Sequence, residues 1–150
     1  MRRVIRLVDG LALLFVAWAA LAMVPVEWVW FNPGNPVVSD STTKIAPSVD
    51  FSRVIKRPTV MSYGIVIRNV SQATVVCDPD GGPFTYRPEA TLPEGVDLVW
   101  WTGGDDRCWP RDVGTYIMET CWTVKHPFYG IVPPKTVCRE SNTFTIFPSD

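Results

Sequence analysis

The chain has 150 residues, of which 47% are hydrophobic and 12% aromatic, and its formal net charge is −1. From Asn32 onward it carries 11 basic and 13 acidic residues. This balance excludes a nucleic-acid-binding surface, which needs a basic stripe. The length allows one ordinary domain and one additional segment, since a domain of about 100 residues buries roughly two-thirds of its unfolded surface.

The first predicted element is a transmembrane helix, or signal anchor, over residues 7–31. Residues 10–26 contain no charged side chain, and the apolar character continues to Phe31. A helix of this length covers the ~30 Å hydrocarbon core of a bilayer. Three arginines lie in residues 1–6, so the positive-inside rule predicts a cytoplasmic N-terminus and an extracytoplasmic C-terminal domain, periplasmic or extracellular. The chain is therefore expected to be a single-pass membrane protein that contacts the lipid bilayer.

Two alternatives exist for the same segment. Ala20-Leu21-Ala22 matches a signal-peptidase site, and cleavage there would release a secreted protein. Both the anchor and the cleaved signal peptide leave residues 32–150 outside the cytoplasm. A buried core helix is a third option, although the sequence offers no helices for it to pack against.

Residues 32–57 are predicted to form a linker. Their first half is dense in Asn, Pro, Gly, Ser and Thr, a composition that cannot sustain a helix. Arg53, Lys56 and Arg57 follow as a basic group. We interpret this group as a solvated edge in preference to a lipid-headgroup site.

Residues 58–150 are predicted to form an all-β domain. Apolar residues alternate with others between Met61 and Val70, which is typical of a strand. A second predicted strand places Val96, Leu98 and Trp100 on one face. A third is expected to have one apolar face, formed by Tyr116, Met118, Trp122 and Val124. Gly- and Pro-rich turns separate these runs. Short strands without helices favour a β-sandwich or a small barrel.

One local motif sharpens this expectation. The run from Asp112 through Gly114 to Tyr116 resembles the tyrosine corner that opens the penultimate strand of immunoglobulin-like and fibronectin-type domains. The resemblance covers residues 96–147 and implies an Ig-like antiparallel β-sandwich, but no activity. Cys121 departs from the antibody pattern because it stands five residues after the tyrosine instead of two. The inter-sheet disulfide of antibodies is therefore not carried over.

The four cysteines, Cys77, Cys108, Cys121 and Cys138, predict two disulfide bonds in an exported domain. Three pairings are possible. If residues 115–125 and 136–147 form a hairpin, Cys121 and Cys138 lie opposite each other within bonding distance. That geometry favours Cys121–Cys138 and leaves Cys77–Cys108. A Cys77–Cys121 bond would instead indicate an inter-sheet bridge.

No catalytic constellation is apparent, so the chain is predicted not to be an enzyme and to need no cofactor. His126 is the only imidazole and precedes a proline in an expected loop. The aspartates gather in turns, where they favour backbone hydrogen bonds. Asp78-x-Asp80 and Asp105-Asp106 could offer oxygen atoms to Ca²⁺, but they match no complete loop motif, so no metal site is assigned.

The aromatic residues point most clearly to function. Trp100 and Trp122 are assigned to the core, whereas Trp101, Trp109, Phe128 and Tyr129 are predicted to form a binding surface. The predicted function is a membrane-anchored extracytoplasmic β-sandwich module that mediates protein–protein interaction at the cell envelope or surface. The alternatives are a glycan- or peptidoglycan-binding module and an accessory structural component of a membrane or virus-encoded assembly.

Overall fold

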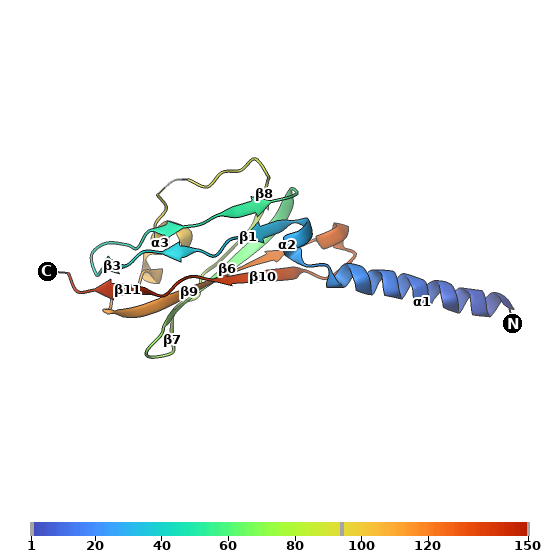
Figure 1. The fold of residues 1–150 in the computed structure, drawn as a ribbon, viewed down its shortest axis with the longest axis horizontal. Coiled ribbons are helices and arrows are strands. Elements are labelled where there is room, and N and C mark those ends of the chain that lie inside the picture. Colours follow the sequence, from blue (N-terminus) through green and yellow to red (C-terminus); the bar gives the residue numbers. More distant parts are fainter. Residues whose placement is uncertain (1, 94, 150) are drawn as a thin grey trace.

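The computed structural model describes the backbone of residues 2–93 and 95–149 and the side chains of residues 9–93 and 95–149. The chain consists mostly of strands in mixed sheets, with one long helix at its N-terminal end (Figure 1). The helical elements are α1 (Arg2–Met23), α2 (Val26–Val29), α3 (Leu98–Trp101) and the 3₁₀ turns η1 (Asp106–Cys108) and η2 (Pro127–Gly130). The strands are β1 (Phe31–Pro33), β2 (Val37–Val38), β3 (Ser41–Thr42), β4 (Val49–Asp50), β5 (Arg53–Ile55), β6 (Thr59–Asn69), β7 (Thr74–Cys77), β8 (Asp80–Tyr86), β9 (Gly114–Val124), β10 (Lys135–Glu140) and β11 (Phe144–Phe147).

The main sheet has seven strands, and β6 and β9 form its centre. They pair antiparallel from Met61↔Val124 to Asn69↔Tyr116. β7 and β8 follow each other along the outer side of β6, and β10 and β11 do the same along β9. β3 then joins β11 in parallel. The expectation of a wholly antiparallel Ig-like sandwich is therefore wrong. The main sheet is mixed, because the early strand β3 runs parallel to the last strand, β11.

The central strands bury one face of this sheet. Along β9 every second side chain is buried, from Tyr116 through Met118 and Trp122 to Val124, as the alternating pattern predicts. β6 contributes Met61, Ile65 and Ile67 to the same core. Period-2 alternation over eleven residues fixes which face is covered, since a slip of one residue would expose the whole apolar set.

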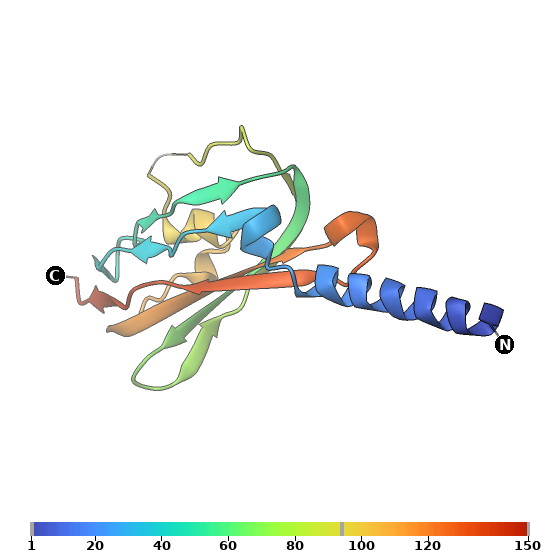
Figure 2. The same ribbon diagram turned by 45° about the vertical axis from the view of Figure 1, so that its right-hand side comes forward.

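A second, smaller layer covers that buried face. It consists of two antiparallel ribbons, β1–β5 and β2–β4, drawn from the segment predicted to be a linker (Figures 1 and 2). The linker prediction for residues 32–57 is therefore wrong. Its apolar residues are widely spaced in the sequence, yet Val38, Val49 and Ile55 are all buried. Phe31 has no exposed surface, and its ring centroid lies 5.3 Å from that of Trp122.

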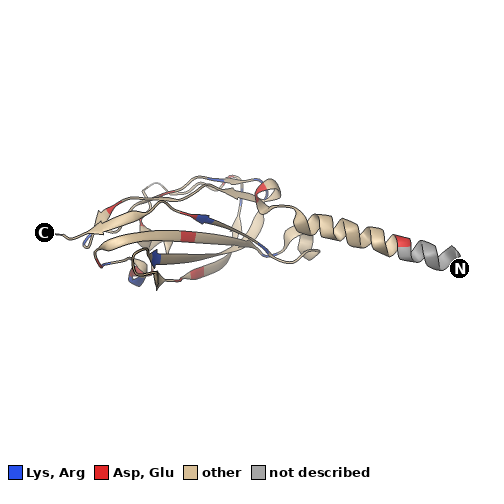
Figure 3. Ribbon diagram, turned by 60° about the horizontal axis from the view of Figure 1, so that its bottom comes forward, with Lys and Arg blue, Asp and Glu red and all other residues tan. Residues whose placement is uncertain are grey.

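The predicted transmembrane helix is also wrong. In the part of the chain that the structure describes, no helix is long and apolar enough to cross a membrane. α1 ends at Met23, and Trp30 and Phe31, which the prediction counted in the span, are buried in the domain core. The uncharged part of α1, Gly10–Met23 (Figure 3), has 14 residues, about 21 Å of helix against the ~30 Å that a bilayer core requires. The side chains of the predicted basic N-terminus, residues 1–6, lie outside the described residues.

A small set of polar contacts holds the end of α1 against the domain. The ammonium group of Lys135, at the start of β10, donates to the backbone oxygens of Leu21, Ala22 and Val24. The indole Nε1 of Trp18 donates to the backbone oxygen of Ile131 at 2.9 Å. A cation is favourable at a helix C-terminus, where the last carbonyl groups lack helical partners. Partial burial lowers the pKa of Lys135.

Both predicted disulfides are present. Cys121 and Cys138 are directly opposite in the β9–β10 register, with their Cα atoms 4.0 Å apart, and Cys77 pairs with Cys108. The chain leaves the strand between Glu140 and Phe144, so Val137 on β10 and Phe144 on β11 are both buried although they are seven residues apart. The Tyr116 hydroxyl donates to the backbone oxygen of Asp112 at 2.9 Å, which is the hydrogen bond of a tyrosine corner. The resemblance to a specific sandwich family stays a prediction, because this hydrogen bond is a local feature.

Candidate functional site

The short helix α3 buries one of two adjacent tryptophans and leaves the other half exposed. Asp97 caps its N-terminus, accepting a hydrogen bond from the backbone nitrogen of Trp100 at 2.8 Å. Residues three apart share a helix face, so Leu98 and Trp101 both point into the core. Trp101 is 8% exposed and Trp100 50% exposed. The predicted strand, with Trp100 buried and Trp101 exposed, is therefore wrong, because the aspartate cap starts a helical turn in place of the alternation.

Beside α3 lies a cavity of about 480 Å³. This volume is within the usual range for small-ligand pockets, ~300–1,000 Å³. The side chains that shape it come from the second layer, from β6 and β8, from the loop before α3, from α3 itself and from β9: Phe51, Arg53, Tyr63, Ile65, Phe84, Tyr86, Leu92, Trp100, Trp101, Thr120 and Trp122. Most of them are aromatic. We call this cavity the aromatic pocket.

The deep side of the aromatic pocket is rigidly held. The indole Nε1 of Trp101 donates to the hydroxyl oxygen of Thr120 at 3.2 Å. The ring of Phe51 packs edge-on against Trp101 and stacks on Trp122, with centroids 4.9 and 5.3 Å apart. Because these polar atoms are already paired, this side of the pocket presents aromatic surface to a ligand.

Two further aromatic rings of the pocket come from β6 and β8. Tyr63 and Phe84 are nearly parallel, with centroids 6.0 Å apart, and Phe84 is about half exposed. Gly81 makes room for this arrangement, since a Cβ atom there would lie 2.7 Å from the Tyr63 ring. Gly103 has a φ of +77° and approaches the Tyr63 hydroxyl in the same way. The absence of a side chain at Gly81 and Gly103 thus leaves room for the Tyr63 ring in the pocket wall.

One cation stands among these rings. The Arg53 guanidinium lies over the ring of Tyr86, 5.5 Å from its centroid, and its Nε atom is buried without a hydrogen-bond partner. Burial lowers the pKa of Arg53, which the neighbouring Tyr86 partly offsets. Burial also raises the pKa of Tyr86, so its phenol stays protonated at neutral pH. The pocket therefore combines apolar walls with a positive charge.

The predicted binding residues do not form one surface. Trp101 belongs to the aromatic pocket, whereas Trp109 lines a separate polar cleft of about 670 Å³, where Arg111 lies 5.1 Å from its ring centroid. Phe128 packs against Trp30, 4.8 Å between centroids, near the end of α1. Tyr129 is fully exposed on η2 and has a φ of +60°. A shared binding surface of these four residues is not what the structure forms.

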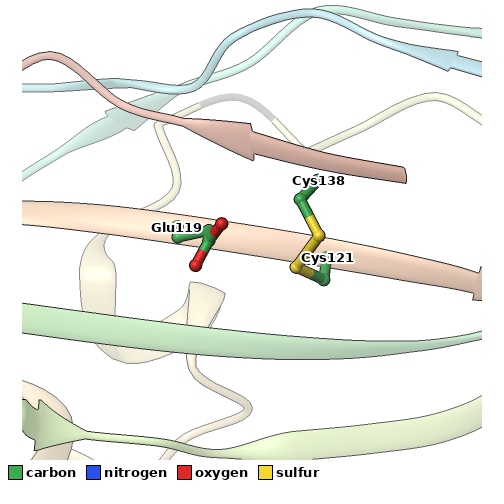
Figure 4. A group of neighbouring side chains, drawn as sticks. All are labelled: Glu119, Cys121 and Cys138. Carbon is green, nitrogen blue, oxygen red and sulfur yellow. A yellow bond between two sulfur atoms is a disulfide. The ribbon is translucent and has the colours of Figure 1, made fainter. Parts of the chain in front are cut away.

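A possible metal-ligand group lies on the other face of the sheet. Glu119, Cys121 and Cys138 have ligand atoms within 4.8 Å of one another (Figure 4). The two sulfur atoms are bonded to each other, so within the described residues this group offers a single carboxylate. Asp105 and Asp106 are engaged by Arg107 and Arg111. The assignment of no metal and no cofactor stays a prediction.

Sequence reasoning missed several residues of the pocket. Phe84 and Tyr86 are two residues apart and so share one face of β8, a signal that was hidden between two turn-rich segments. The sequence predicts a solvated edge for Arg53, Lys56 and Arg57, but Arg53 is partly buried. Its burial depends on β5 pairing with β1, a contact that no local pattern indicates.

No model of a known protein family matches the chain, and the comparison with curated proteins gives no match either.

Proposed function

We propose that this chain is a non-enzymatic binding module, and that its aromatic pocket accepts an apolar side chain of a partner protein. The observation that carries the proposal is the pocket itself, a concave site with aromatic walls, of which Trp100 and Phe84 are half exposed. Half-exposed aromatic rings at a concavity are the side chains that most often dominate protein–protein binding energy.

The chemistry of the walls favours a protein partner over a glycan. Sugar hydroxyls are recognised by side chains that accept and donate several hydrogen bonds, above all carboxylates and amides. Among the described lining residues there is no Asp, Glu, Asn or Gln, and the Thr120 hydroxyl already accepts from Trp101. A glycan could stack on Trp100 but would find few polar partners.

We also propose that the module works in an oxidising compartment outside the cytoplasm. The two disulfides support this, because such bonds persist mainly in exported proteins. The Cys121–Cys138 bond lies on the uncovered face of the sheet, where it would be accessible to cytoplasmic reductants.

The test is a selection of peptides from a random library on the immobilised full-length chain, followed by calorimetry with individual peptides. The selected peptides should share an aromatic or branched aliphatic residue. Trp100→Ala should weaken their binding by roughly tenfold or more, the effect of removing a central anchor residue.

Trp28→Ala is the matched control, because Trp28 is exposed on α2 and does not line the pocket. Its substitution should leave binding unchanged. Peptides that bind the Trp100→Ala and Trp28→Ala variants equally well would show that the aromatic pocket is not the binding site. If oligosaccharides bind in a Trp100-dependent way and no peptide does, the glycan alternative is correct instead.

A further inference from the structure

Arg53 differs from the other half-buried arginines whose side chains the structure describes. Arg68 pairs with Glu119 at 2.9 Å, and Arg139 with Glu27 at 3.1 Å. No acidic group pairs with Arg53 in the described part of the chain, where its guanidinium lies over the face of Tyr86. Its guanidinium therefore lines the pocket with no acidic partner among the described residues, and its Nε is buried without a hydrogen-bond acceptor.

A buried donor without a partner is costly, and for a charged group the cost is larger. A guanidinium offers donors in a planar fork that matches the two oxygens of a carboxylate. The buried Nε is closed to a ligand, but a carboxylate held end-on by the two terminal nitrogens of Arg53 would neutralise the charge. The surrounding aromatic walls would at the same time accept an apolar group attached to that carboxylate.

We infer that the aromatic pocket recognises an apolar group that carries a carboxylate, with Arg53 binding the carboxylate and the rings around Trp100 binding the apolar group. Two sources share this chemistry: the C-terminal residue of a polypeptide and a free aromatic acid. The inference rests on the proposed role of the aromatic pocket as the ligand site. It adds the prediction that charge, and not apolar contact alone, selects the ligand.

The neighbourhood of Arg53 argues for a single carboxylate in place of a more strongly charged anion. Apart from Arg53, the described lining residues include no lysine, arginine or histidine. A phosphate group would therefore lose its hydration in an apolar cavity against one positive charge. The negative charge of one carboxylate and the positive charge of one guanidinium cancel.

The experiment compares matched acids and amides by calorimetry on the full-length chain. The free-acid probe is N-acetyl-tryptophan and its neutral match is N-acetyl-tryptophanamide. The peptide probes are two hexapeptides that end in tryptophan, one with a free C-terminus and one amidated. The acid of each pair should bind at least tenfold more tightly than its amide. Arg53→Gln should reduce that ratio to about one, and Arg57→Gln, an exposed arginine two residues past β5, should preserve it.

The outcomes separate the two proposals. If acids and amides bind equally well in the unaltered protein, the carboxylate inference is overturned and the aromatic pocket remains the ligand site. If the free acid binds in an Arg53-dependent way and neither peptide does, the inference is supported and the protein-partner proposal fails. Arg53→Lys keeps the charge and should retain part of the ratio. Should Arg53→Gln not fold, the ratio in the unaltered protein still decides.

Discussion

Trp122 and Trp100 lie in the same part of the molecule but in opposite circumstances. Trp122 is 4% exposed, and its ring lies 5.3 Å from both Phe31 and Phe51, so aromatic side chains of the second layer close over it. Trp100 has a tilted contact with Trp101, and half of its surface is uncovered. Burial of the Trp122 ring stabilises the fold. The uncovered half of the Trp100 ring still contacts water, so its burial by a ligand would contribute to binding.

The largest expected effect follows from this contrast. Trp122→Ala should lower the free energy of unfolding by about 3–5 kcal/mol, the usual cost of an aromatic cavity in a core. Trp100→Ala should lower it by less than about 1 kcal/mol, since the ring is half solvated. Urea unfolding of both variants measures the difference. Equal losses would mean that the two rings are equally part of the core.

The two disulfides extend the comparison from the sheet centre to the pocket. Their residues are 31 and 17 positions apart, so the chain-entropy model gives about 4 kcal/mol for Cys77–Cys108 and about 3 kcal/mol for Cys121–Cys138. Replacing each pair by serines should reduce stability by these amounts. Only the loss of Cys77–Cys108 should also weaken pocket binding, because that bond fixes η1, which follows α3. Ligand affinity that falls equally in both double variants would contradict this.

Gly81→Val tests the pocket wall alone. The new side chain would collide with the Tyr63 ring and should displace it, at a cost of about 1–3 kcal/mol in unfolding free energy, typical of overpacking. Peptide binding should fall as well, since Tyr63 forms part of the wall. Gly64→Val is the control, because a Cβ atom there meets nothing within 4 Å. An unchanged affinity for Gly81→Val would remove Tyr63 from the site.

The smallest effect concerns α1, which lies farthest from the sheet centre. Lys135→Met removes the charge at its C-terminus, worth about 0.3–1 kcal/mol at an exposed helix end. Amide hydrogen exchange in the last two turns of α1 should become faster, with little change in the β6 and β9 amides. Lys125→Met is the control. It removes an equivalent charge at the other end of the loop between β9 and β10, and should not affect α1.

The well-predicted parts of the fold were those where many residues repeat one pattern. Alternation along β6 and β9 gave the buried face, and the expected hairpin of residues 115–125 and 136–147 gave the opposition of Cys121 and Cys138. The failures occurred where a few residues outweigh a pattern. Asp97 starts α3 and reverses the orientations of Trp100 and Trp101.

The second layer escaped prediction for a different reason. Its strands are two or three residues long, too short for any period to show, and their pairing is set by the surface they cover. The same limit explains the aromatic pocket, of which sequence reasoning found Trp101 and missed Arg53, Tyr63, Phe84 and Tyr86. These residues come from β5, β6 and β8 and meet only after the sheet has formed.

The parallel pairing of β3 with β11 sets the order in which the chain can fold. Ser41 lies beside Ile146, and Phe31 lies against Trp122, so the first strands to be synthesised need the last ones as their support. Until β9 has been made, the apolar residues of β1 to β5 have no sheet to cover and remain exposed to proteases and chaperones. A ribosome-bound chain that stops before Gly114 should accordingly be digested throughout residues 31–55. The early segment would become resistant only when the final hairpin is complete.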